Sequence, residues 1–185
     1  MIRLKSNEIL VLRTCEQDMT SYNGFKWKKK GVVTAHDWEP TYRCGNGLHG
    51  LPWGQGGDYL YMGGIWLVLK VDTSEDYITG GPELTDKCKF RTCTVVYAGT
   101  REEATQLIYD NAPNGTIVFG LSLTGGDRAT LTGGDWATLT WRKYDSDWKI
   151  DDGHFYRLTT VYVGENGIKP NTAYELVNGE VIEAS

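Results

Sequence analysis

An octapeptide that occurs twice without a gap constrains this chain more than any other feature. The copies are TGGDRATL at residues 124–131 and TGGDWATL at 132–139, which differ only in Arg128 and Trp136. Eight residues are too few for a helical repeat, so the period predicts one strand and one turn per copy, stacked as a solenoid. Gly-Gly-Asp suits the turn, because glycine accepts positive φ and aspartate hydrogen-bonds its own backbone.

Two full copies are fewer than the roughly three repeats that a solenoid needs to bury a continuous core. We therefore expect a short solenoid-like segment, or a wide hairpin, carried by a globular fold. The 185 residues include 23 Gly, 11 Tyr and 7 Trp, a mixture that favours strands and turns over helices. The predicted fold class is α+β, mainly β, with one helix packed on a β-sheet core.

Two apolar runs, residues 65–71 (IWLVLKV) and 89–97 (KFRTCTVVY), are the strongest strand signals. The predicted helix runs over 101–111, with Thr100 as its N-cap and Glu103 completing a capping box. We expect residues 1–115 to form an α+β core with a Gly-rich loop. Residues 116–185 are expected to form a β-rich repeat and C-terminal hairpin region within the same compact unit.

The charge balance argues against a protein that binds nucleic acid. The chain has 19 Lys and Arg against 24 Asp and Glu, a formal net charge of −5, whereas phosphate-backbone binders carry a basic face. One basic run, residues 26–30 (KWKKK), is either a solvated strand edge or a local anion site. No stretch reaches the roughly twenty apolar residues of a membrane span, and the N-terminus has no signal pattern. We expect a cytoplasmic protein with no membrane partner and with its four cysteines as free thiols.

The Gly-rich loop from Cys44 to Gly50 is the first candidate site. Glycines on either side let backbone N–H groups approach a ligand, and His49 is a candidate proton donor, metal ligand or ligand contact. The alternative is a tight loop in which His49 caps a backbone carbonyl. A zinc site would need Cys44, His49, Cys88 and Cys93, but these spacings are not those of structural zinc knuckles, and no metal is expected.

A nucleophile pair of Cys44 and His49 is a further alternative, but no third residue that orients the pair is evident. Catalytic residues therefore remain unassigned, and an enzyme is the less favoured interpretation. Three tryptophans, Trp27, Trp38 and Trp53, lie in Gly-rich or charged loops. They either plug the ends of the β core or line an aromatic and cationic pocket for a nucleotide-like or sugar-like ligand.

Six residues carry a resemblance to an uncharacterised domain family of bacterial and phage proteins: Cys44, Gly47, Leu48, His49, Asp86 and Lys87. In that family a Cys-x-x-Gly-Leu-His loop precedes a strand and a later Asp-Lys. The rest of the chain resembles bacterial proteins with ice-nucleation-like octapeptide arrays, which end in a strand-rich tail like residues 161–174. A fainter similarity, through Arg13 and residues 45–49, is to ADP-ribosyltransferase-type folds.

The leading hypothesis is a non-enzymatic protein that binds a nucleotide-derived small molecule without a cofactor. The resemblance implies a phage or mobile-element protein that sequesters a host signal or inhibits a host defence system. One alternative is an NAD-using enzyme of ADP-ribosyltransferase type. Another is a structural protein that forms homo-oligomers by pairing of repeat edges. The predicted ligand-binding residues are Arg13, Lys26, Trp27, Cys44, Gly45, Gly47, His49, Trp53, Lys87 and Arg91.

Overall fold

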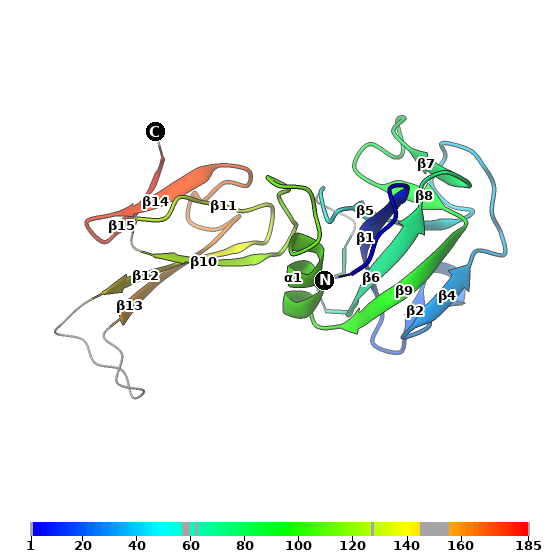
Figure 1. The fold of residues 1–185 in the computed structure, drawn as a ribbon, viewed down its shortest axis with the longest axis horizontal. Helices are drawn as coiled ribbons and strands as arrows, with labels where there is room; N and C mark the ends of the chain where they lie inside the picture. Colours follow the sequence, from blue (N-terminus) through cyan, green and yellow to red (C-terminus); the bar gives the residue numbers. More distant parts are fainter. Residues whose placement is uncertain (1, 57–59, 62, 127, 145–155, 185) are drawn as a thin grey trace. The chain divides into compact units, whose positions relative to one another are not determined.

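The computed structural model describes residues 2–56, 60–61, 63–126, 128–144 and 156–184. The described chain is mainly β with a single α-helix, which confirms the predicted α+β, mainly β fold class (Figure 1). It divides into two compact units, Met1–Val118 (unit 1) and Phe119–Ser185 (unit 2). No helix among the described residues is long and apolar enough to cross a membrane.

Unit 1 is built on a seven-stranded sheet in the order β4-β9-β6-β1-β5-β8-β7, and every pairing in it is antiparallel. A separate two-stranded ribbon precedes β4. The elements are β1 (Glu8–Cys15), β2 (Thr20–Ser21), a 3₁₀ turn (Tyr22–Gly24), β3 (Phe25–Lys26), β4 (Gly31–Thr34), β5 (Leu48–Pro52), β6 (Ile65–Asp72), β7 (Tyr77–Thr79), β8 (Cys88–Phe90), β9 (Thr92–Gly99) and α1 (Arg101–Tyr109).

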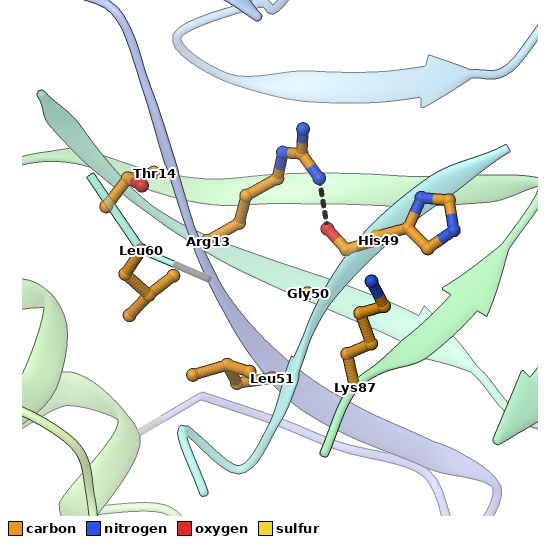
Figure 2. A pocket seen from close by; sticks show the side chains of 7 residues that line it. All are labelled: Arg13, Thr14, His49, Gly50, Leu51, Leu60 and Lys87. Carbon is orange, nitrogen blue, oxygen red and sulfur yellow. Dashed lines mark hydrogen bonds between the residues drawn. The ribbon is translucent and has the colours of Figure 1, made fainter. Parts of the chain in front are cut away.

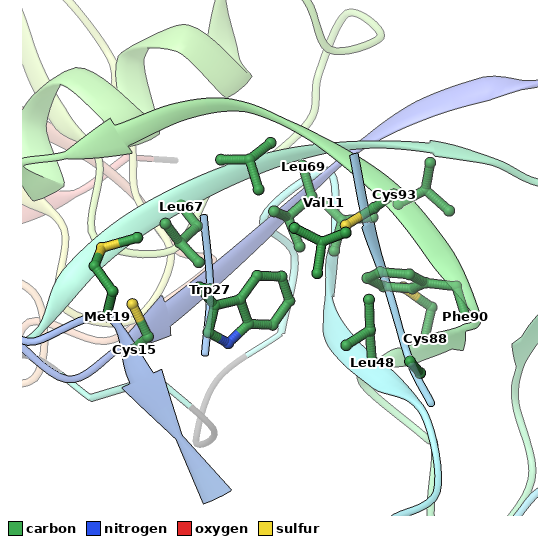
Figure 3. Close-up of a cluster of buried hydrophobic side chains, with 14 residues drawn as sticks. Val11, Cys15, Met19, Trp27, Leu48, Leu67, Leu69, Cys88, Phe90 and Cys93 are labelled. Atoms are coloured by element: carbon green, nitrogen blue, oxygen red, sulfur yellow. The ribbon is translucent and has the colours of Figure 1, made fainter. Parts of the chain in front are cut away.

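The two longest apolar strands, β1 and β6, pair along their full length in the middle of the sheet. Both carry apolar side chains on both faces, because both faces are covered. On one face Val11, Leu67 and Leu69 join a core that includes Trp27 and Phe90 (Figure 3). On the other face α1 lies against β1 and β6.

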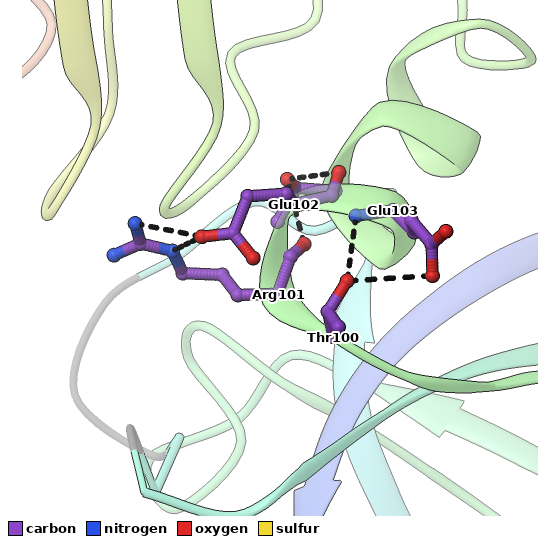
Figure 4. Close-up of polar contacts among 5 residues, drawn as sticks. Thr100, Arg101, Glu102 and Glu103 are labelled. Carbon is purple, nitrogen blue, oxygen red and sulfur yellow. Dashed lines mark hydrogen bonds and ion pairs between the residues drawn. The ribbon is translucent and has the colours of Figure 1, made fainter.

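The Thr100 N-cap predicted for the helix is present (Figure 4). The Thr100 backbone N–H, which a capping box would pair with the Glu103 carboxylate, donates instead to the Tyr97 hydroxyl at 2.9 Å. Thr100 has extended backbone angles, and its hydroxyl accepts a hydrogen bond from the Glu103 backbone N–H at 3.3 Å. Ala104 and Ile108 lie on the buried face of α1. The helix ends at Tyr109, two residues before the predicted end, since Asp110 already serves as the C-cap.

Unit 2 contains two three-stranded sheets, β10-β12-β13 and β11-β14-β15. Its strands are β10 (Ser122–Gly126), β11 (Leu131–Thr132), β12 (Thr138–Tyr144), β13 (Tyr156–Tyr162), β14 (Ala173–Val177) and β15 (Glu180–Glu183). The pairing of β10 with β12 is parallel, and Leu123 stands opposite Leu139. Paired residues of β10 and β12 are 16 positions apart in the sequence, which is the length of two octapeptides. One turn of the solenoid is therefore made of both copies. The repeat is therefore a solenoid coil and not a wide hairpin.

Candidate functional site

A small cavity opens where β5 diverges from β1. The two strands pair only at Val11 with Pro52 and at Leu12 with Leu51. One residue further, the Arg13 side chain spans the gap, and its Nη1 donates a hydrogen bond to the His49 carbonyl at 2.6 Å (Figure 2). The cavity has a volume of about 70 Å³ and is lined by Arg13, Thr14, His49, Gly50, Leu51, Leu60 and Lys87.

Glycine is required at position 50, next to the residues of β5 that pair with β1. A Cβ on Gly50 would lie closer than 3.0 Å to the Val11 side chain and to the Leu12 carbonyl oxygen. A larger residue would push the strands apart and displace His49, which follows Leu48 in β5. The Gly-rich segment thus sets the width of the cavity as well as the course of the loop.

Arg13 is a cation in a largely apolar setting. Its guanidinium carbon lies 4.9 Å from the centre of the Trp27 ring, an arrangement that favours a cation–π contact. Burial lowers the pKa of Arg13 to about 10. Its Nε is buried and has no hydrogen-bond partner among the described residues. The guanidinium therefore retains capacity to bind a negatively charged group.

Lys87 and Cys44 meet at the edge of this site. Lys87 is only 8 % exposed, and its Nζ donates to the Cys44 Sγ at 3.1 Å. The Cys44 backbone N–H donates to the Glu83 carboxylate at 2.8 Å. Cys44 is exposed, whereas the other three cysteines are buried, and none of the four forms a disulfide.

Sequence reasoning missed Lys89, which holds the Gly-rich loop in place. Its fully buried Nζ donates to the carbonyls of Arg43 and Gly45 and to the Thr41 hydroxyl, at 3.0 to 3.3 Å. It also lies 5.7 Å from the centre of the Trp38 ring. The feature of the sequence that could have indicated this role is a lysine inside an otherwise apolar strand. Nothing local to that strand indicates that its partners lie more than forty positions earlier.

His49 is neutral near pH 7. Burial, and then the nearby charges of Arg13, Lys87 and Lys89, lower its pKa to about 4. Its Nε2 is buried without a hydrogen-bond partner among the described residues. His49 also stands opposite Lys89 in the pairing of β5 with β8, which explains the cationic surroundings.

The predicted site residues do not all come together. Arg13, His49 and Lys87 line the cavity, Trp27 packs against Arg13, and Cys44 contacts Lys87. Gly45 and Gly47 shape the adjoining loop, both at positive φ. Three residues lie elsewhere: Lys26 donates to the Asp18 carbonyl, exposed Arg91 pairs with Asp76 at 3.3 Å, and Trp53 is absent from the cavity wall.

The four residues of the zinc alternative do not form one cluster in the described part of the chain. The described residues contain no group of three or more His, Cys, Asp or Glu side chains that could hold a metal ion. Cys88 and Cys93 are buried among apolar side chains, where burial raises the pKa of each thiol to about 12. These thiols belong to the core.

A second candidate site lies in unit 2, on one face of the β10-β12-β13 sheet. Cross-strand register aligns Thr124 with Thr140 and Thr160, and the Oγ1 atoms of Thr140 and Thr160 lie 3.1 Å apart. Leu123, Leu139 and Val161 point to the opposite face and pack in the core of unit 2. The hydroxyl-bearing residues of the outer face, here called the hydroxyl face, are Ser122, Thr124, Thr138, Thr140, Thr160 and Tyr162.

Both octapeptides fold in the same way beneath this face. A Cβ on Gly125 would lie closer than 3.0 Å to Ala129, and a Cβ on Gly133 would meet Ala137 in the same manner. Each copy also closes a turn with a 3.1 Å hydrogen bond, from Ala129 N–H to the Gly126 carbonyl and from Ala137 N–H to the Gly134 carbonyl. The repeat therefore encodes one packing unit, used twice.

Comparison with known proteins identifies two relationships. Residues 9–107 match the family model described as "Domain of unknown function (DUF7666)". An ice nucleation protein of Pseudomonas fluorescens is 40 % identical over 111 residues, which cover 58 % of this chain and 9 % of the relative. Ice nucleation protein InaU of Pantoea ananas is 34 % identical over 108 residues, which cover 57 % of this chain and 10 % of the relative. The chain thus spans about a tenth of the length of these relatives, and no solved structure matches it.

These relationships correct several predictions. The hypothesis of a nucleotide-derived ligand, with a viral role against host defence, is wrong, because the relatives are named for ice nucleation. The prediction of a small-molecule partner and the NAD-using alternative are overturned with it. The expectations of a cytoplasmic location and of no membrane partner are likewise overturned, since the relatives are named ice nucleation proteins.

The similarity to an uncharacterised domain family and to ice-nucleation-like repeat proteins is confirmed in outline. The names of the relatives describe a nucleating activity and not a catalytic one. The family match covers more than half of the chain and includes every residue of the cavity wall. The chain belongs to the DUF7666 family.

Proposed function

We propose that this chain is a structural, non-catalytic protein related to ice nucleation proteins, and that its hydroxyl face orders water at an ice surface. The observation that carries the proposal is the 16-residue parallel register of β10 and β12. It brings hydroxyl side chains of successive turns of the chain side by side on one face of the sheet. The relationship to ice nucleation proteins supplies the kind of activity to test.

The spacing of the hydroxyl face is regular in two directions. Alternate residues along a strand are about 6.6–6.8 Å apart, and neighbouring strands are about 4.7–4.9 Å apart. Each Ser or Thr hydroxyl is both a donor and an acceptor of hydrogen bonds. A packed core beneath the sheet holds these groups in place, because Leu139 and Trp141 are fully buried. Such a grid can bind water molecules in fixed relative positions.

The C-terminal strands close one end of the coil. β13 pairs with β12, and β14 pairs with β11, and both pairings are antiparallel. A further solenoid coil would have to pair in parallel with the same strand edges. The segments from β13 to β15 therefore act as a cap that ends the repeat on this side and protects its edges from aggregation.

The hydroxyl face has a limited area, so we expect the chain to bind an existing ice surface more readily than it starts freezing. The test is partition of labelled protein into ice that grows slowly from solution. Thr124→Lys combined with Thr160→Lys places two long charged side chains on the face. This double variant is expected to stay in the liquid, whereas the wild-type protein enters the ice.

Glu180→Lys is the matched control, because it also changes the net charge by two and lies on exposed β15, outside the hydroxyl face. The control is expected to partition like the wild type. Exclusion of the wild type from ice, or equal partition of the wild type and the double variant, would contradict the proposal. Circular dichroism of each variant establishes that the fold is retained.

For unit 1 we propose that the Cys44, Gly47, Leu48 and His49 motif is a structural signature of the family. Leu48 is buried in the core, and a Cβ on Gly47 would press against the Trp38 ring and the Lys89 side chain. Gly47→Ala is expected to destabilise unit 1, because it adds this contact at a φ of 146° that side-chain-bearing residues rarely adopt. Gly45→Ala is the informative comparison, since Gly45 also has a positive φ, of 92°, and no described residue lies within 4 Å of its Cβ.

A further inference from the structure

The hydroxyl face consists of two rows of side chains that run directly across β10, β12 and β13. In each row every residue is the direct cross-strand partner of its neighbour, since β12 pairs with β10 on one side and with β13 on the other. The first row is Ser122, Thr138 and Tyr162, and the second, here called the threonine row, is Thr124, Thr140 and Thr160. The two rows therefore form a rectangular grid, in which neighbouring strands are not staggered.

This grid has a short repeat across the strands and a long repeat along them. Neighbouring strands lie about 4.7–4.9 Å apart, and alternate residues of one strand lie about 6.6–6.8 Å apart. The hydroxyls of Thr140 and Thr160 also restrain each other, because their Oγ1 atoms are within hydrogen-bond distance, at 3.1 Å. The face thus presents a two-dimensional pattern and not a single line of hydroxyls.

The faces of hexagonal ice differ in how their oxygen atoms repeat. The primary prism face has a rectangular net, with the a axis of the crystal as its short repeat and the c axis as its long repeat. The basal face has the same short repeat, but its adjacent rows are staggered by half of that repeat. The secondary prism face lacks the short repeat altogether. Direct cross-strand register therefore shares the symmetry of the primary prism face.

The lengths of the repeats favour the same face. The a axis of ice is slightly shorter than the separation of neighbouring strands, on the prism face and on the basal face alike. The c axis exceeds the spacing of alternate residues by about a tenth, whereas the long rectangular repeat of the basal face exceeds it by about a sixth. The long repeat is thus the one that distinguishes the two faces.

We propose that the hydroxyl face selects the primary prism face of ice, with the threonine row along the a axis and the strands along the c axis. This inference rests on the proposed function and names the ice surface that the site recognises. The threonine row supplies the short repeat. The two rows together supply the long repeat, so selection between ice faces requires both.

The test is to grow a single ice crystal of known orientation in a dilute solution of the full chain carrying a fluorescent dye. The dye is attached at Cys44, which is exposed and belongs to unit 1, whereas the hydroxyl face belongs to unit 2. Fluorescence is expected only in ice that has grown on primary prism faces. Fluorescence confined to the basal face, or spread evenly over all faces, would overturn this inference and leave ice binding itself in place. A crystal without fluorescence on any face would overturn both.

Loss of the threonine row is the first comparison. The double variant Thr124→Lys with Thr160→Lys is expected to leave the crystal dark, and Glu180→Lys is expected to give the wild-type pattern. Prism-face fluorescence as strong in the double variant as in the wild type would overturn the inference, because another surface would then bind the ice.

Loss of the first row is the second comparison. Ser122→Ala combined with Thr138→Ala keeps the threonine row, and with it the short repeat that the prism and basal faces share. This variant is expected to lose the preference of the wild type for the prism face over the basal face. A preference as strong as that of the wild type would overturn the role assigned to the long repeat.

Discussion

At the scale of single residues, the candidate site of unit 1 depends on which basic side chains lie around His49 and which are exposed to solvent. Arg13, Lys87 and Lys89 gather around His49, whereas Arg91, only two positions beyond Lys89, is exposed. These residues look alike in the sequence. Their difference arises from their places in the fold, because Lys89 lies within β8, which pairs with β5 and β7, whereas Arg91 lies in the connection between β8 and β9.

Because of His49, the free energy of unfolding is expected to depend on pH. Its pKa in the folded protein, about 4, is below the ordinary value near 6.5, so the unfolded chain binds the proton more readily between these values. The contribution of His49 is fully present above about pH 6.5 and is lost as the pH falls toward 4. We expect urea unfolding at pH 7.0 and 4.5 to show a larger loss of stability for the wild type than for His49→Gln. Equal losses would contradict the burial of a neutral imidazole.

Cys44 is expected to be the reactive thiol of the native protein. It is exposed and receives a hydrogen bond from Lys87, whereas burial raises the pKa values of Cys15, Cys88 and Cys93. Brief treatment with iodoacetamide should therefore modify one site, identified by mass spectrometry. Cys44→Ser should remove this reaction, and rapid labelling of the variant at another cysteine would show that the core opens more readily than the structure implies.

At the scale of elements, the helix was predictable because its signals are local. The Thr100 and Glu103 pair lies within one turn, and the structure confirms the cap. Thr100→Ala is expected to reduce the free energy of unfolding by about 1 kcal/mol, the usual value for loss of an N-cap. Chemical denaturation measures this change, and a loss below a few tenths of a kcal/mol would mean that the cap contributes little.

The octapeptide makes a sharper prediction about two glycines. Gly133→Ala would place a Cβ against Ala137 and is expected to cost about 1–3 kcal/mol through overpacking. Gly126→Ala is the matched control, because no described residue lies within 4 Å of its Cβ and its φ is not positive. Denaturation curves that shift equally for both variants would contradict the repeated packing unit.

The period of the repeat predicted a strand and turn for each copy, but it did not decide between a solenoid and a hairpin. The choice depends on whether β10 pairs with the next copy of the repeat or with the copy after it. The sequence does not distinguish these two pairings, because both place the leucines on the same face of the sheet. The structure pairs Leu123 with Leu139, two copies apart. Contacts with the C-terminal strands, which lie outside the repeat, complete the core through Val163 and Tyr174.

At the scale of the whole molecule, the fold class and the family resemblance were accessible from sequence, whereas the function was not. The Gly-rich loop with Cys44 and His49 suggested ligand chemistry, and the nucleotide-binding hypothesis gave that loop more weight than the repeat. In the structure the loop is held by carbonyl contacts to Lys89, and it borders a cavity too small for a nucleotide. The repeat and the names of the relatives instead support the proposal that the hydroxyl face contacts ice.

The most direct test of the central claim is the fraction of labelled wild-type protein that enters slowly growing ice, relative to Thr124→Lys combined with Thr160→Lys. The hydroxyl face predicts enrichment of the wild type in the ice and exclusion of the double variant, with Glu180→Lys behaving as the wild type. Exclusion of all three proteins from the ice would contradict an ice-facing role for this sheet.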